Sequence, residues 1–220
     1  MNEIKWKAAS EKGTGHRRNQ DAWFCDVLKN HRDRGIFAIA DGVGSLDAPA
    51  TASRLVISGI RDWWKKTDSG GLGALKVHLE IIDQAIRDYG TRRGLCMATT
   101  LSVLLIDGAQ GGILQIGDSK ILRLRRRGAE LLTIDHLLSR EGLLISCLGN
   151  ARAHFDVMER YIPISAGECF LLGSDAVFKR KPALRPYVFG REKELLTTVR
   201  DLGETDDLTA VGVEVGGNVR

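Results

Sequence analysis

The chain has 220 residues, of which 43% are hydrophobic and 27% are charged, and its formal net charge is +4. This composition argues against a disordered or collagen-like chain, and the small charge does not by itself indicate nucleic-acid binding. No apolar run approaches the roughly 20 residues of a membrane-spanning helix, and the first residues contain no signal-peptide core. We therefore expect a cytoplasmic protein without a membrane partner, with residues 1–220 forming one domain.

The predicted elements alternate between short apolar runs and amphipathic stretches. Runs rich in Val, Ile, Leu and aromatic residues, bounded by Gly, Asp or Asn, predict strands, and apolar residues three or four apart predict helices. In chain order we expect strands at 22–27 and 36–40, helices from 47 to about 66 and from 72 to about 89, strands at 98–106, 112–116, 121–124, 130–134, 154–162 and 169–172, a helix at 191–202 and a strand at 208–215. Strands in close succession favour antiparallel hairpins, so the fold class is α+β, with helices packed outside an antiparallel core.

Four aspartates stand where a predicted strand meets a loop. Asp41, Asp118 and Asp175 follow strands, and Asp206 precedes the last one. If these strands lie side by side, the carboxylates meet at one edge of the core, where a cation would relieve their repulsion. Oxygen ligands without His or Cys suit Mg²⁺ or Mn²⁺ better than zinc or copper. Any one of these aspartates, taken alone, is more often a simple turn residue, whereas four on separate strands favour a shared site.

Short motifs follow one another in a fixed order from about residue 14 to residue 215. They are N-Q-D-A from position 19, D-G-V-G from 41, M-A-T-T-L from 97, G-D-S-K from 117, D-H from 135, S-C-L-G from 146, L-L-G-S-D from 171 and D-D-L-T from 206. Each motif is weak alone, but their joint order is specific. Together they resemble the metal-dependent serine/threonine protein phosphatases of the type 2C, or PPM, family, particularly its small bacterial single-domain members.

The resemblance implies two stacked antiparallel sheets flanked by helices, an α-β-β-α sandwich with two Mn²⁺ or Mg²⁺ ions at one end. Asp41 would bridge both ions and the Gly42 carbonyl would bind one of them. Asp175 and Asp206 would bind the other ion, and Asp118 with Asp175 would form a third, weaker metal site. Completing the catalytic set, Asp21 would hold metal-bound water. A hydroxide bridging the two ions would then hydrolyse phosphoserine or phosphothreonine.

Several positions depart from the family pattern. His16 stands where the phosphate-binding arginine is expected, so His16 and the following Arg17 and Arg18 are the candidate phosphate ligands, although an exposed arginine pair is often simply solvated. Ala176 replaces a glycine and would be strained if its φ were positive. Asp207 replaces an asparagine, and it either strengthens a metal site or is an ordinary surface acid.

Three functional hypotheses follow. The leading hypothesis is an active phosphatase that acts in signal transduction on a phosphorylated protein, opposing a cognate Ser/Thr kinase by family analogy. The alternative is a pseudophosphatase that binds phosphoprotein without turnover, as the departures at His16, Ala176 and Asp207 suggest. Basic runs at 123–127 and 179–185 raise a third hypothesis, a nucleic-acid binder, but we expect no nucleic-acid partner because no recognition motif accompanies them. Solvated turns and loops explain such basic runs better than a docking patch does.

Overall fold

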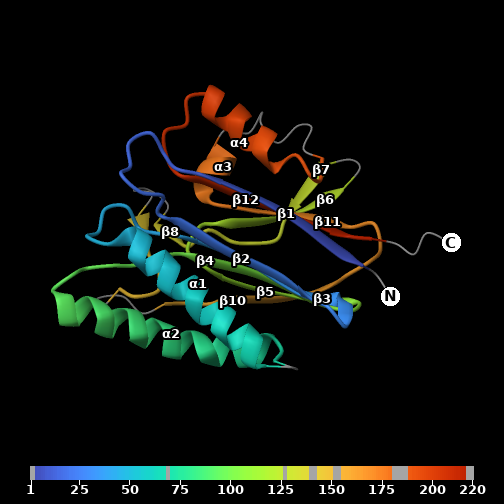
Figure 1. The fold of residues 1–220 in the computed structure, drawn as a ribbon, viewed down its shortest axis with the longest axis horizontal. Coiled ribbons are helices and arrows are strands. Elements are labelled where there is room, and N and C mark those ends of the chain that lie inside the picture. The colour runs from blue at the N-terminus through green and yellow to red at the C-terminus, as the bar shows by residue number, and fades with distance from the viewer. Residues whose placement is uncertain are drawn as a thin grey trace.

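The described residues form two antiparallel sheets that lie face to face, with helices on both outer surfaces. A computed structural model describes residues 3–67, 70–125, 128–138, 143–150, 155–179 and 188–216. Two helices cover one sheet and two cover the other, so that the layers follow the predicted α-β-β-α order (Figure 1). The α+β sandwich expected from the sequence is therefore confirmed.

The sheets have five strands each, and every pair of neighbours is antiparallel. The first sheet has the order β1-β12-β11-β6-β7, with the strands at Ile4–Glu11, Leu208–Val215, Cys169–Gly173, Lys120–Arg125 and Gly128–Leu131. The second has the order β10-β5-β4-β3-β2, with the strands at Met158–Pro163, Gln110–Ile116, Leu101–Asp107, His31–Asp41 and Asp21–Leu28. A separate two-stranded sheet pairs β8 (Leu137–Leu138) with β9 (Leu143–Leu144).

The helices divide between the two outer surfaces. Helices α1 (Pro49–Lys66) and α2 (Leu72–Arg93) cover the second sheet, whereas α3 (Asp175–Lys179) and α4 (Glu192–Asp201) cover the first (Figure 1). In α1 the buried residues recur at three- and four-residue intervals, and basic residues occupy the last turn, where they complement the helix dipole. None of the described helices combines the length and the apolar character needed to cross a bilayer.

The second half of strand β3, residues 36–40, is apolar without interruption. Ile36 and Ala38 pack into the cluster under α1 and α2, whereas Phe37 and Ile39 point into the cluster between the two sheets. Successive strand residues face opposite sides, so a strand that is covered on both faces needs apolar residues at every position. The central strands thus hold rigidly the loops at their ends.

Several element boundaries differ from those expected. Strand β1 was not expected, although lysines alternate there with Ile4, Trp6 and Ala8, which face the core between the sheets, and such alternation is typical of a half-buried strand. The short helix α3 was also missed, and β4 begins three residues later than expected. Strand β7 ends at Leu131 rather than 134, and the expected start of a strand at 154 lies outside the described residues.

Candidate active site

Antiparallel pairing brings the ends of the second sheet's strands to one edge. Asp21 begins β2 and lies directly opposite Asp41, the last residue of β3. Strands β3 and β5 both run antiparallel to β4, so Asp118, which follows β5, lies at the same edge. Strand direction alone therefore gathers three aspartates that are 20 and 77 residues apart in the sequence.

The first sheet supplies two more aspartates. Strands β11 and β12 are antiparallel neighbours, so Asp175 after β11 and Asp206 before β12 lie at the same end. These two, with Asp41 and Asp118, line one cleft of about 190 Å³. The structure thus brings together the four strand-end aspartates predicted from the sequence. Gly42 and His16 line the same cleft.

Thr99 and Thr100 of the M-A-T-T segment form hydrogen bonds with both backbone groups of Asp41. Its carbonyl oxygen accepts hydrogen bonds from the Thr100 N–H at 2.8 Å and from the Thr99 hydroxyl at 2.8 Å. Its N–H donates to the Thr100 hydroxyl at 3.0 Å. These bonds explain why two threonines occur together there, since they fix the direction of the Asp41 side chain.

Asp118 lies in the turn between β5 and β6. Gly117 has a φ of +97°, which favours glycine, and the Ser119 hydroxyl lies 2.8 Å from the Thr100 hydroxyl. Lys120 forms an ion pair with Asp135, so the D-H motif also supports this turn. Burial, and then the charge of Asp175, raises the pKa of Asp118 from 3.8 to about 6 against the lowering effect of Lys120.

Asp21 is buried beside the cleft rather than lining it. Neither of its side-chain oxygens has a hydrogen-bond partner among the described residues. Burial raises the pKa of Asp21 from 3.8 to about 7 against the opposing effect of the nearby Thr209 and Ser174 hydroxyls, and the charge of Asp207 raises it further. A buried carboxylate without donors is costly, and a cation or ordered water would remove that cost.

The cleft as a whole holds excess negative charge. The pKa of Asp41 is raised well above its ordinary value, first by lost hydration and then by the charges of the four other aspartates. Such a cluster of oxygens, with two orphaned atoms at Asp21, fits hard divalent cations such as Mg²⁺ or Mn²⁺. These carboxylate oxygens are therefore suitable ligands for the Mg²⁺ or Mn²⁺ ions that the sequence predicts.

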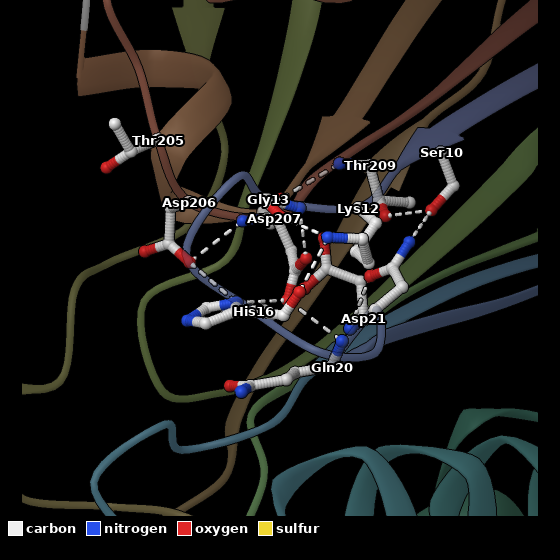
Figure 2. Close-up of polar contacts among 12 residues, drawn as sticks. Ser10, Lys12, Gly13, His16, Gln20, Asp21, Thr205, Asp206, Asp207 and Thr209 are labelled. Atoms are coloured by element: carbon white, nitrogen blue, oxygen red, sulfur yellow. Dashed lines mark hydrogen bonds and ion pairs between the residues drawn. The ribbon is translucent and has the colours of Figure 1, made fainter.

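His16 reaches the cleft because Asp207 holds it there. The Nδ1 atom of His16 lies 2.8 Å from Asp207 Oδ2 and 3.8 Å from Asp206 Oδ1. Asp207 also accepts the N–H groups of Gly13 at 2.5 Å and Gln20 at 2.8 Å (Figure 2). One carboxylate thus anchors the whole loop from 13 to 20.

The structure accounts for the departures from the family pattern at Asp207, His16 and Ala176. Asp207 is only 3% exposed and does not line the cleft, so the interpretation as an ordinary surface acid is wrong. It also contacts His16, the other departure, so the two replacements form one pair. Ala176 is buried within α3, and no described residue other than glycine has a positive φ, so the strain considered for Ala176 does not arise.

Arg17 and Arg18 do not line the acidic cleft. They are exposed and line a neighbouring groove that runs along the first residues of α1 and shares His16 and Gln20 with the cleft. Within the described parts of the chain neither arginine has an ion pair. Of the three candidate phosphate ligands, His16 alone therefore has its place in the cleft.

The basic runs have structural explanations where they are described. Arg123 is buried, with its guanidinium 5.5 Å from the ring of Phe170 and 3.5 Å from Glu168. It is therefore a core residue rather than a solvated one, whereas the exposed Arg125 pairs with Glu130 at 2.8 Å. Residues 126–127 and 180–187 lie outside the described residues.

One residue of the site has no clear signal in the sequence. Lys179 ends α3, and its Nζ lies 3.0 Å from Asp175 Oδ2 and 3.5 Å from Asp206 Oδ2. Partial burial lowers the pKa of Lys179, but the charges of Asp175 and Asp206 outweigh this effect and hold it above the ordinary value. Only the spacing of four from Asp175 could have indicated the contact, had α3 been predicted.

A two-sheet sandwich with an aspartate-lined cleft at one end is the architecture that the motif order implied. The profile of the family described as protein phosphatase 2C matches residues 12–138. This match covers more than half of the chain, which therefore belongs to the protein phosphatase 2C, or PPM, family.

Individual relatives agree with this assignment. The chain is 29% identical over 161 residues to the protein phosphatase PhpP of Streptococcus pneumoniae, a match that covers 70% of this chain and 65% of that protein. The catalytic domain of the serine/threonine phosphatase PstP, solved with two manganese ions, has 23% identity and a TM-score of 0.84 over 99% of this chain and 100% of that one.

A second solved structure shows the same fold. PppA of Pseudomonas aeruginosa, described as a regulatory component of a type VI secretion system, has 23% identity and a TM-score of 0.82. The match covers 97% of this chain and 98% of PppA. At these identities the two structures establish the fold and leave the chemistry to the residues of the cleft.

Proposed function

We propose that this chain is an active metal-dependent phosphatase that removes phosphate from phosphoserine or phosphothreonine in proteins. The observation that carries the proposal is the convergence of Asp41, Asp118, Asp175 and Asp206 on one cleft, beside the buried and unpaired carboxylate of Asp21. A family relationship alone would fit an inactive relative equally well. An active phosphatase of this kind requires all of its metal-binding aspartates, and they are present in this chain.

Each aspartate takes the role that the family resemblance gives it. Asp41 and the Gly42 carbonyl would hold one ion, with Asp41 shared between both ions, whereas Asp175 and Asp206 would hold the other. Asp118 would contribute to a third, weaker site. Two divalent ions would supply a nucleophile by lowering the pKa of a shared water, and would neutralise phosphoryl charge.

The remaining residues would position the substrate. His16, whose Nδ1 is held by Asp207, lies at the cleft, and in its protonated form it would donate a hydrogen bond from Nε2 to a phosphoryl oxygen in place of the family arginine. Asp21 would hold ordered water near the ions through its two free oxygens. The substrate is a phosphorylated protein, and the opposing enzyme would be a serine/threonine kinase.

Both sheets contribute aspartates to the cleft, so the site needs the two halves of the sandwich together. We therefore propose residues 1–220 as one catalytic domain. Cytoplasmic location, as expected from the sequence, would place the enzyme with intracellular phosphoproteins.

The decisive experiment measures hydrolysis of p-nitrophenyl phosphate and of a phosphothreonine peptide while Mn²⁺ is titrated into the stripped protein. We expect metal-dependent activity that falls by about 100-fold or more in Asp41→Ala and Asp175→Ala, because each loses a shared ligand. Circular dichroism should show that both variants stay folded. Equal activity of Asp41→Ala and the wild type at saturating Mn²⁺ would refute the site.

A wild-type protein that binds Mn²⁺ but hydrolyses neither substrate would instead support the pseudophosphatase. The structure weakens two of the reasons for that alternative. Ala176 is unstrained, and Asp207 completes the loop that carries His16.

A further inference from the structure

Lys179 joins two carboxylates that come from different parts of the chain. Asp175 begins the short helix α3 and Lys179 ends it, so one helical turn brings their side chains together at 3.0 Å. The contact with Asp206 is not local, because Asp206 precedes β12 and lies 3.5 Å from the same ammonium group. An ordinary pair within a helix would need no second carboxylate.

In the parts of the chain that the structure describes, the ammonium of Lys179 is the nearest cation to these two carboxylates. Among the described residues, the ion pairs of Asp175 and Asp206 involve only Lys179 and, at 3.8 Å from Asp206, His16. Asp206 Oδ1 already accepts the Asp207 N–H at 2.8 Å, so Oδ2 is the oxygen directed at Lys179. Lys179 therefore occupies the side of Asp206 that remains free.

These are the same two carboxylates that the proposed function assigns to one divalent ion. An ion held by both would lie within a few ångströms of the ammonium, and like charges at that separation repel appreciably even near a protein surface. The ion and the ammonium therefore cannot both keep their closest contacts with Asp175 and Asp206.

We propose that Lys179 is an internal cation that competes with the divalent ion for Asp175 and Asp206, and so lowers the metal affinity of the cleft. In the metal-free protein the single ammonium charge offsets part of the charge of the two carboxylates and so reduces their mutual repulsion. When the ion binds, the ammonium moves outward. The lysine side chain is 47% exposed and has a flexible stem, so it can reach solvent without disturbing the core.

This inference rests on the proposed metal site, and it predicts that loss of the lysine charge raises the metal affinity but lowers the stability of the metal-free protein. In Lys179→Met the apolar stem is kept and the charge is lost. We expect the dissociation constant for Mn²⁺ to fall about fivefold, a modest effect because the pair is partly exposed and screened. We also expect the melting temperature of the metal-free variant to fall, since the two carboxylates then repel without compensation.

The experiment is isothermal titration calorimetry of the full chain, stripped with EDTA, with MnCl₂ alone as the probe, together with thermal unfolding in EDTA. Lys179→Arg keeps the charge and should bind Mn²⁺ like the wild type. Lys76→Met is the matched control, because Lys76 on α2 is also 47% exposed and pairs with Glu159 on β10 at 2.9 Å, outside the cleft. Raising the salt concentration should shrink the difference between Lys179→Met and the wild type.

The possible failures are distinguishable. If Asp175→Ala weakens Mn²⁺ binding but Lys179→Met binds with unchanged or lower affinity, the competition by Lys179 is refuted while the metal site stands. If neither the wild type nor Lys179→Met binds Mn²⁺, both the site and the competition are refuted. Tighter binding by Lys76→Met as well would show a general charge effect and would also overturn the proposal.

Discussion

Two buried aspartates of the site, Asp21 and Asp207, have opposite surroundings. Asp207 accepts two backbone N–H groups and contacts His16, so both of its carboxylate oxygens have partners within the protein. Asp21 has no hydrogen-bond partner among the described residues and is surrounded by other acids. The first carboxylate stabilises the fold, and the second is suited to binding a cation or water.

Removing the Asp207 carboxylate should release the loop from 13 to 20. We expect Asp207→Ala to lower the free energy of unfolding by about 2–3 kcal/mol, because buried N–H groups lose their acceptor. Asp207→Asn keeps one acceptor oxygen and should fall in between. Urea denaturation measures both, with Asp62→Ala on the exposed side of α1 as a control that should change by less than about 0.5 kcal/mol. Equal effects of Asp207→Ala and Asp62→Ala would contradict the anchoring role.

The raised pKa of Asp21 predicts how the metal-free protein responds to pH. Its folded pKa is about 7 and the ordinary value is 3.8, so between these values the folded state binds more protons than the unfolded state. Stability must therefore fall as the pH rises through this window. We expect Asp21→Asn to be more stable than the wild type at about pH 7.5 and to lose less stability between about pH 5 and 7.5.

Chemical denaturation in EDTA at these pH values measures the effect. Asp118, whose pKa is raised to about 6, contributes in the same direction, so some pH dependence should survive in Asp21→Asn. An identical pH dependence in the variant and the wild type would show that Asp21 is not buried as a proton-binding group.

At the scale of elements, the end of β3 and the start of α1 approach each other closely. A Cβ atom at Gly42 would lie 2.4 Å from the carbonyl oxygen of Pro49, the first residue of α1, and 2.5 Å from its carbonyl carbon. Backbone atoms cannot move aside as a flexible side chain can. The close packing of these two elements therefore requires glycine immediately after Asp41.

We expect Gly42→Ala to destabilise the protein by about 2–3 kcal/mol, because strand and helix must separate to admit the methyl group. Gly73→Ala in α2 is the control, since a Cβ there meets nothing within 4 Å and should raise stability by about 0.5 kcal/mol. Thermal unfolding of both variants tests the pair. A neutral Gly42→Ala would mean that the strand and helix are less tightly packed than described.

At the scale of the whole molecule, the cleft joins the two sheets. Asp41 and Asp118 come from the second sheet, and Asp175 and Asp206 come from the first. Ions bound there would connect the two halves of the sandwich, so ligand binding should stabilise the entire fold.

We expect Mn²⁺ to raise the melting temperature of the wild type. One site held at about 100 times its dissociation constant adds about 2.7 kcal/mol, which for a chain of this size is roughly 5–10 °C. Scanning calorimetry with Mn²⁺ and with EDTA measures the difference. The shift should disappear in Asp41→Ala and persist in Asp62→Ala, and a shift of equal size in Asp41→Ala would place the ions elsewhere.

The sequence alone predicted an antiparallel core with helices outside it and the aspartates at its strand ends, because the spacing of apolar residues is a local property of the chain. The two stacked sheets were expected from the order of the motifs, through the family resemblance. It did not show that Asp207 and His16 form a pair, that Asp21 is left without partners, or that Lys179 reaches Asp206. The contact between His16 and Asp207 joins residues 191 positions apart and depends on the pairing of β1 with β12, and the contact between Lys179 and Asp206 joins residues 27 positions apart. The burial of Asp21 depends on how the two sheets stack, because Asp21 begins a strand of one sheet and lies beside Ser174 and Thr209 of the other. Stacking decides which charges meet and which groups lose their water, and these two factors set the chemistry of the cleft.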